Sequence, residues 1–230
     1  MSKISIRFFN DREVRAIWDE ANPNPTDGVQ LVSVTHEFKF EAPDGKKRVA
    51  DALDNEWQSK KKAYTFMESN IIADGDIGTV KALQQIHAYI FGGLYDFAGQ
   101  IRTKTISKGG FTFCLAEYLH PALRDIEKMP EDTFNQIVDK YVEMNVAHPF
   151  MEGNGRSTRI WLDLILKKRL QRCIDWSKIN KKDYLQAMQT SVVNASPIYG
   201  LLSSALTDKI NDRETFMKGI DYSYYYEQED

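Results

Sequence analysis

From about residue 54 to the end of the chain, apolar residues recur three and four positions apart, which places them on one face of an α-helix. In the segment 132–147, for example, Ile137 and Tyr141 share a face. Pro149 disfavours helical geometry at the preceding residue, so we expect this helix to stop at His148. The pattern predicts a mainly helical protein, with helices at about 54–70, 79–91, 115–128, 132–147, 155–171, 181–191 and 198–206.

Residues 1 to about 50 have a different pattern. β-prone runs at 4–9, 14–18 and 29–40 are separated by turn-forming residues, and a Pro-Asp-Gly turn signal follows at 43–45. We therefore predict a β-rich extension of unknown role over residues 1–50 and a helical domain over residues 51–230.

Composition argues against several classes of partner. The chain has 30 Lys and Arg against 33 Asp and Glu, a net charge of −3, which does not suit a broad face for duplex nucleic acid. Cys114 and Cys173 are too few for a disulfide framework, which favours a reducing compartment. The N-terminal residues lack a signal-peptide pattern, and no apolar run approaches the ~20 residues of a membrane span. We expect a cytoplasmic protein that binds no membrane.

Residues 148–159, with the sequence HPFMEGNGRSTR, contain groups that suit a phosphate-binding site. Gly153 and Gly155 allow the backbone to approach a ligand closely, and the free N–H groups at the start of the next helix attract anions. Arg156 and Arg159 are three positions apart and share one face of the first helical turn. This combination predicts a site that binds a phosphate group or chain.

Two further side chains suggest group transfer. Glu152 would repel a bare polyphosphate, but it suits Mg²⁺ held between one carboxylate and substrate phosphates. His148, at its ordinary pKa, is mostly neutral near pH 7.5 and can take a proton from an attacking hydroxyl. A Gly-Asn-Gly alone is typical of a plain turn, a dinucleotide fingerprint fails because Thr158 occupies its third glycine position, and a catalytic zinc needs more ligands than His148 and Glu152 supply. The pattern therefore favours phosphoryl or nucleotidyl transfer.

At every defined position, residues 148–159 match the Fic-domain signature His-Pro-Phe-x-(Asp/Glu)-Gly-Asn-Gly-Arg-x-x-Arg. A second family-like block spans 83–102, with Phe97 where the family commonly has Trp. The sequence thus resembles Fic-domain protein adenylyltransferases over about 54–230. The resemblance implies a compact helical Fic fold that transfers AMP from ATP to a Ser, Thr or Tyr hydroxyl of a target protein.

The resemblance also implies a role for each motif residue. His148 is the expected general base, Glu152 the Mg²⁺ ligand, and Phe150 a core residue that fixes the loop. Phosphates are expected at Gly153, Asn154, Gly155, Arg156 and Arg159, with Arg156 on the β-phosphate and Arg159 on the γ-phosphate.

A β-hairpin is predicted within 105–113, where Gly109 and Gly110 can supply the positive φ of a tight turn. It resembles the flap with which Fic proteins dock a target segment by strand addition. Its expected docking residues are Ile106, Ser107, Lys108, Gly109, Gly110 and Phe111.

The C-terminal residues combine a core-packing pattern with an inhibitory motif. Ser223 and Glu227 are four apart on one helix face, and the tyrosine-rich stretch alone predicts a terminal helix packed on the core. It also resembles the class III inhibitory helix, (Ser/Thr)-x-x-x-Glu-(Gly/Asn), although Gln228 departs from the last position. We expect a helix at about 219–230 in which Glu227 pairs with Arg159 and keeps it from ATP. Candidate self-modification sites are Tyr222, Tyr224, Tyr225 and Tyr226.

Other functions remain open from the sequence alone. Doc-type kinases of the same fold transfer a phosphate instead, but they carry Lys where Gly155 stands, which favours AMP transfer here. A non-catalytic interaction protein, or a DNA-linked regulator acting through residues 1–50, is a different class of function. The family suggests a bacterial cytosolic target, while the target itself, the nucleotide preference and any homo-oligomer are undetermined.

Overall fold

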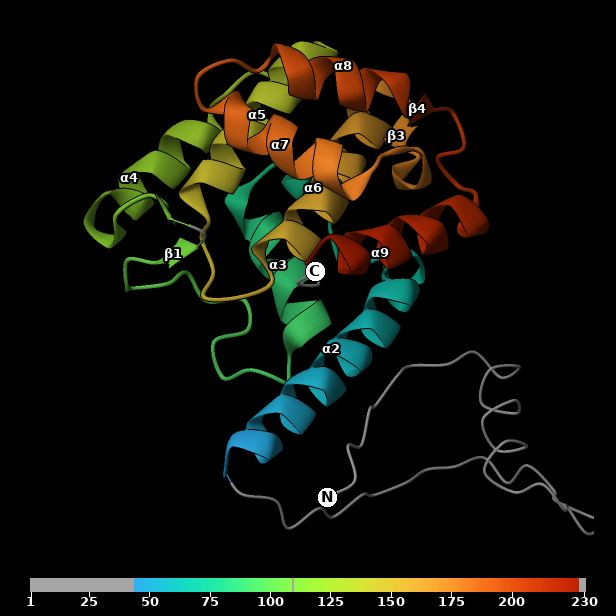
Figure 1. Ribbon diagram of the computed structural model, residues 1–230. Coiled ribbons are helices and arrows are strands. Elements are labelled where there is room, and N and C mark those ends of the chain that lie inside the picture. The colour runs from blue at the N-terminus through green and yellow to red at the C-terminus, as the bar shows by residue number, and fades with distance from the viewer. Residues whose placement is uncertain (1–43, 109, 228–230) are drawn as a thin grey trace, which may run out of the picture. The chain divides into compact units, whose positions relative to one another are not determined.

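The computed structural model of the chain describes residues 44–108 and 110–227, with side chains from residue 54 onward. This part of the chain is mainly helical, as predicted (Figure 1). No helix in it is both long and apolar enough to cross a membrane. Its α-helices are α2 (Asp44–Ser69), α3 (Val80–Phe91), α4 (Ala116–Glu127), α5 (Phe134–Ala147), α6 (Asn154–Leu170), α7 (Lys181–Ser191), α8 (Ser196–Ser204) and α9 (Arg213–Glu227).

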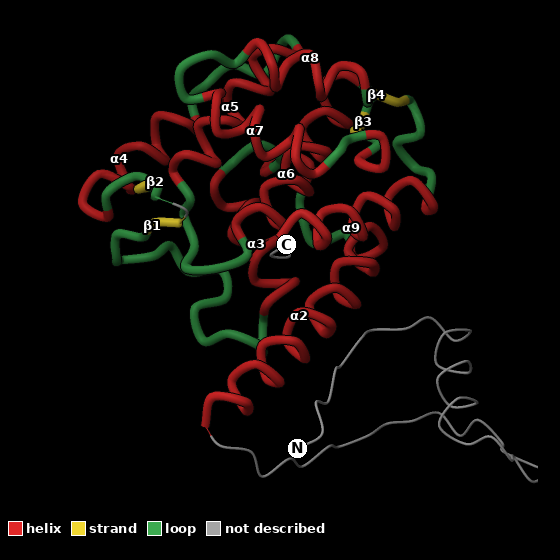
Figure 2. The backbone as a smooth tube through the Cα atoms, viewed as in Figure 1, coloured by secondary structure: helices red, strands yellow, loops and turns green. Residues whose placement is uncertain are grey.

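Short strands accompany the helices (Figure 2). β1 (Ser107–Lys108) pairs antiparallel with β2 (Phe111–Thr112), which confirms the hairpin predicted within 105–113. β3 (Cys173–Ile174) pairs with β4 (Leu206–Thr207) and links the end of α6 to the segment after α8. No sequence signal predicted this second pair, because its two-residue strands lie far apart in the chain and no tight turn joins them.

Helix α6 occupies the middle of the bundle and carries the start of the candidate site. It packs against α3, α5 and α9, which lie around it in Figure 2. Ile160, Trp161, Leu162 and Ile165 are all buried, and a helix that is apolar on several faces belongs in a core. Packing against α3, α5 and α9 therefore fixes the position of the N-terminal turn of α6.

The main differences from the prediction lie at the ends of the described chain. α2 begins at Asp44 rather than near residue 54, so residues 44–50 are helical and not part of a β-rich extension. Residues 1–43 lie outside the described residues, and the strands predicted there stay predictions. α9 begins at Arg213 rather than near residue 219, and Gln228 lies outside the described residues.

Candidate active site

The candidate site begins where α5 ends. His148 adopts a left-handed backbone conformation, with φ 50° and ψ 64°, and its N–H donates to the carbonyl of Met144 at 3.0 Å. The helix therefore stops at His148, as predicted from Pro149. A non-glycine residue in this region costs roughly 1–2 kcal/mol, so neighbouring contacts must hold His148 in place.

The His148 ring is fixed in one tautomer. Nδ1 lies 3.2 Å from the carbonyl oxygen of Asn145, and a carbonyl only accepts, so Nδ1 carries the proton and Nε2 keeps a free lone pair. The Phe113 ring stacks on the imidazole at a centroid distance of 3.7 Å. Burial lowers the pKa of His148 from 6.5 to about 4, so the ring is neutral at physiological pH. A neutral Nε2 can accept a proton.

The loop between α5 and α6 is closed by its own side chains. Gly153 has φ 78°, and a Cβ there would lie 2.3 Å from the ring of Phe91, so both conformation and space require glycine. The Asn154 amide accepts from the N–H of Phe150 and donates to its carbonyl, both at 2.8 Å. The Asn154 side chain thus braces the loop, and its predicted contact with phosphate stays a prediction. Phe150 is fully buried, as expected of a core residue.

Arg156 has the properties of an anion-binding residue. Its guanidinium lies between the rings of Phe91 and Tyr224, at 4.9 and 5.2 Å, and the residue is 6% exposed. One Nη donates to Glu152 at 2.5 Å, while the buried Nε has no hydrogen-bond partner. A buried donor without a partner is costly, and a phosphate oxygen would satisfy it.

Glu152 is the only carboxylate that the motif supplies. Its side chain is 53% exposed and paired with Arg156. Within the described residues, no group of three or more His, Cys, Asp or Glu could hold a metal ion by itself. One carboxylate together with substrate phosphates fits the usual coordination of Mg²⁺, so a metal there would depend on bound nucleotide.

Arg159 donates to two residues of helix α9 and to Tyr184 of α7. Its Nε donates to the hydroxyl of Ser223 at 2.7 Å, and one Nη donates to the Ser223 carbonyl at 2.8 Å and to the Glu227 carboxylate at 2.6 Å. The other Nη donates to Tyr184 at 3.4 Å. Burial would raise the pKa of Glu227, but the charge and hydrogen bond of Arg159 lower it below its ordinary value. The predicted pairing of Glu227 with Arg159 is therefore present.

Tyrosines of α9 also pack on the site. Tyr226 stacks on Tyr184 at 5.0 Å, and both rings lie within about 6 Å of the Arg159 guanidinium. Of the four tyrosines considered for self-modification, Tyr224 and Tyr226 are buried, with hydroxyls that donate to other groups. Tyr225 is 49% exposed and Tyr222 partly buried. In the docked helix, Tyr225 is thus the most accessible.

The hairpin lies next to both the base and α9. Phe113, directly after β2, stacks on His148, and Lys108 Nζ in β1 lies 3.9 Å from a Glu227 oxygen. Ser107 and Thr112 face each other across the hairpin with hydroxyls 2.9 Å apart. Ile106 accepts from the Phe113 N–H, Gly110 has φ 80°, and Gly109 lies outside the described residues.

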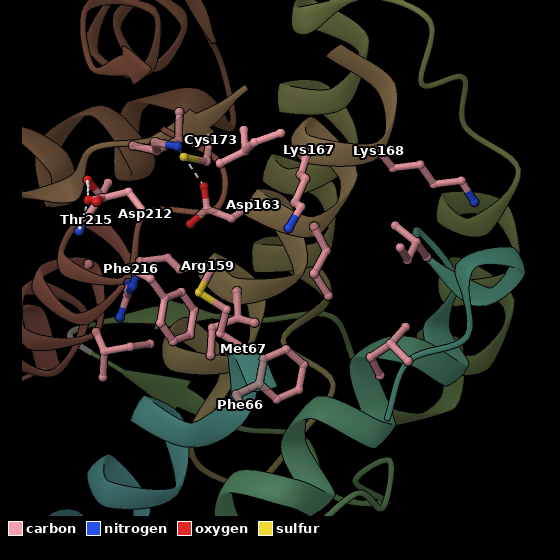
Figure 3. Close-up of a pocket in the computed structure, with 18 of the residues that line it drawn as sticks. Phe66, Met67, Arg159, Asp163, Lys167, Lys168, Cys173, Asp212, Thr215 and Phe216 are labelled. Atoms are coloured by element: carbon pink, nitrogen blue, oxygen red, sulfur yellow. Dashed lines mark hydrogen bonds between the residues drawn. The ribbon is translucent and has the colours of Figure 1, made fainter. Parts of the chain in front are cut away.

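A cavity of about 570 Å³ lies on the far side of Arg159 (Figure 3). Residues of α2, α6, α9, β3 and the segment 70–77 line it, and Phe66, Asp163 and Phe216 contribute to its walls. Burial raises the pKa of Asp163 to about 7, although two N–H groups donate to its carboxylate. Apart from Arg159 and Ser223, no residue assigned to the site by sequence lines this cavity.

Sequence reasoning missed two buried polar residues that contact the motif. His87 accepts from the N–H of Gly99 through Nδ1 at 2.8 Å, so Nε2 carries the proton and donates to the Glu152 carbonyl, also at 2.8 Å. Arg102 donates to the His148 carbonyl at 2.7 Å. Both belong to the block at 83–102, whose resemblance to the family was the available signal.

The part of the chain that contains the motif is similar in sequence to known proteins. Residues 78–166 match the sequence model of the Fic/DOC family. A probable protein adenylyltransferase y4lH of Sinorhizobium fredii is 30% identical over 129 residues, covering 51% of this chain and 66% of the relative. The probable protein adenylyltransferase Fic of Escherichia coli is 26% identical over 144 residues, covering 57% and 71%. The protein adenylyltransferase VbhT of Bartonella schoenbuchensis is 27% identical over 153 residues, covering 60% and 31%.

Solved structures show the same fold. The BepC protein of Bartonella tribocorum, with bound AMPPNP, superimposes with a TM-score of 0.60 at 17% identity, over 76% of this chain and 93% of that chain. A Fic domain from Bartonella quintana with bound ADP gives a TM-score of 0.61 at 16% identity, over 76% and 91%.

Proposed function

The chain carries a Fic domain of the Fic/DOC family, and from this premise we propose that it is a protein adenylyltransferase. A target hydroxyl attacks the α-phosphorus of ATP, the bond to the β-phosphate breaks, and pyrophosphate leaves. His148 Nε2, with its free lone pair, accepts the hydroxyl proton. The names of the relatives support this reaction, and the neutral, oriented imidazole supports the base.

The nucleotide's phosphates would lie on the first turn of α6. The N–H groups there lack intrahelical partners, and the unpartnered Nε of buried Arg156 points to an anion. Mg²⁺ would neutralise phosphate charge during transfer. Glu152 would hold it once phosphates replace the carboxylate as the partner of Arg156.

We propose further that α9 inhibits this reaction. The observation that carries the proposal is that every nitrogen of the Arg159 guanidinium is already hydrogen-bonded, to Ser223, Glu227 or Tyr184, and that the Glu227 carboxylate paired with it would repel the γ-phosphate end of ATP. ATP could still bind with its α-phosphate misaligned. Of the tyrosines on α9, Tyr225 is the first candidate for self-modification while the helix is docked.

The flap supplies the target-binding part of the proposal. β1 and β2 form a two-residue ladder, so each strand leaves backbone groups that an added target strand could pair with. The stacking of Phe113 on His148 places this hairpin beside the base. The acceptor is a Ser, Thr or Tyr hydroxyl in a segment that binds as an extended strand.

Intact-mass spectrometry after incubation with ATP and Mg²⁺ tests the reaction, its base and its inhibition together. We compare the wild type, Glu227→Gly, and Glu227→Gly combined with His148→Ala. Addition of AMP in Glu227→Gly, weaker in the wild type and absent without His148, is expected.

A phosphate mass instead would assign the protein to the phosphotransferases of the fold. If Glu227→Gly modifies neither itself nor any protein in a bacterial lysate supplied with labelled ATP, the proposal of AMP transfer fails.

A further inference from the structure

The segment between α3 and the flap contains a buried cation, the guanidinium of Arg102. Arg102 is 3% exposed and lies a few residues before β1. A buried guanidinium is costly unless its donors are satisfied. Its partners therefore indicate why the chain keeps a charge at this position.

Every nitrogen of the Arg102 guanidinium donates to a backbone carbonyl. Nε donates to His148 at 2.7 Å and Nη1 to Lys104 at 2.6 Å, while Nη2 donates to Cys114 at 2.6 Å and to Ala147 at 3.0 Å. The carbonyls of Ala147 and His148 belong to the C-terminal end of α5, which carries a partial negative charge. The planar guanidinium can reach four separate acceptors, whereas an ammonium group is a point donor.

These four carbonyls belong to two parts of the molecule, the flap and the end of α5. The proposed reaction needs a fixed position of one relative to the other. Lys104 and Cys114 are the residues at the two bases of the hairpin, on either side of β1 and β2. His148 is the proposed base. The Cys114 N–H also donates to the Val146 carbonyl at 3.1 Å, so the second base of the hairpin is attached directly to α5 as well.

We propose that Arg102 is a positioning residue that ties both bases of the flap to His148, so that a target strand added to the flap presents its hydroxyl to Nε2. The catalytic part of this inference rests on the proposed function. The mechanical part, a flap whose two bases one side chain joins to the end of α5, does not. Replacing the Arg102 side chain leaves the backbone bond from the residue 102 N–H to the Pro149 carbonyl at 2.8 Å, the Cys114 N–H bond to Val146 and the Phe113 ring on His148, but removes the four bonds that reach both bases of the hairpin and the end of α5.

His87, in the preceding helix α3, provides a matched comparison. Its Nε2 donates to the Glu152 carbonyl, on the phosphate side of the site, and none of its hydrogen bonds reaches the hairpin. Loss of His87 should therefore affect nucleotide binding, and loss of Arg102 should affect the flap. A variant that was only less stable overall would change both nucleotide binding and the flap.

Hydrogen–deuterium exchange of the full chain tests the tie. We compare the wild type, Arg102→Lys, Arg102→Gln and His87→Leu, and measure AMPPNP affinity by calorimetry in the same samples. In both Arg102 variants, amides of residues 103–114 should exchange about tenfold to 100-fold faster, because bonds to a charged donor are lost. Amides in α6 should keep their protection, and the AMPPNP affinity should stay within about threefold. His87→Leu should show the opposite, with weaker AMPPNP binding and an unchanged flap.

The His148 ring gives a second readout, by NMR titration. Arg102 and Lys108 lower its pKa and Glu227 raises it, so Arg102→Gln should raise the His148 pKa more than Arg102→Lys. Wild-type flap protection in both Arg102 variants would overturn the inference. If Arg102→Gln also loses α6 protection, it is unfolded and Arg102→Lys decides. Neither readout requires group transfer, so absence of AMP transfer would refute the proposed function and leave the tie standing.

Discussion

The carboxylate of Glu227 lies directly over Gly155, so closely that a Cβ at residue 155 would be 2.1 Å from Glu227 Oε1 and 3.1 Å from the Arg159 guanidinium. The two residues are on different helices, α6 and α9. The missing side chain at residue 155 is thus what allows the carboxylate to reach Arg159. A glycine that the motif uses for close approach of a phosphate also admits a carboxylate in its place.

Gly155→Ala should weaken the docking of α9. The added methyl must displace the Glu227 carboxylate, and such overpacking costs about 1–3 kcal/mol. We expect α9 amides to exchange about tenfold or more faster in this variant, measured by hydrogen–deuterium exchange. Gly200→Ala, in α8, is the control, because nothing lies within 4 Å of a Cβ there. Equal protection of α9 in both variants would contradict the steric argument.

Ser223→Ala should relieve inhibition less than Glu227→Gly does. Ser223→Ala leaves the Arg159 Nε buried without its 2.7 Å acceptor, at a cost of about 1–2 kcal/mol. Glu227→Gly removes the charged partner as well, for which we expect about 2–3 kcal/mol and a 30- to 150-fold rise in transfer rate. Initial rates of AMP incorporation measure the order. A larger effect of Ser223→Ala would show that the helix acts through the serine contacts instead.

Local patterns in the sequence predict part of the site, whereas its long-range contacts exist only in the folded chain. The stop at His148, the glycines of the loop and the i, i+4 pair on α9 are local patterns, and the structure places them as expected. Arg102 and His87 are single polar residues whose partners in the motif, His148 and Glu152, lie about 45 to 65 positions away, and no spacing rule predicts such pairings. Asn154 is a local case that its residue type did not reveal: its amide bonds with the backbone of Phe150, only four positions away, and no spacing rule gives that role to an asparagine.

Gly153→Ala should destabilise the fold severely. The residue has φ 78°, and a Cβ there would lie 2.3 Å from the buried Phe91 ring, so strain and overlap add. Gly93→Ala separates the two effects, since Gly93 has φ 77° but nothing within 4 Å of a Cβ. We expect about 1–2 kcal/mol for Gly93→Ala and at least about 3 kcal/mol for Gly153→Ala, from urea unfolding. Similar losses for the two variants would mean that the loop moves away from Phe91 at little cost.

The buried His87 should make the protein less stable in mild acid. Burial lowers the pKa of His87 from 6.5 to about 4, so between these values the unfolded chain binds a proton that the folded protein does not. Stability from this group is complete above about pH 6.5 and falls as the pH drops to about 4, by up to about 3 kcal/mol. Asp163, whose pKa burial raises to about 7, acts in the opposite direction, so the wild-type curve alone shows only a net effect.

The difference between the wild type and His87→Gln isolates the histidine, because Asp163 and His148 are common to both proteins. Glutamine does not titrate in this range, and its amide can still donate to the Glu152 carbonyl in place of Nε2. We expect the free energy of unfolding of His87→Gln, relative to the wild type, to rise as the pH falls from about 6.5 to 4, and to be constant above about pH 7. Urea unfolding at a series of pH values measures this difference. A constant difference across the whole range would mean that His87 is protonated as readily in the folded protein as in the unfolded chain.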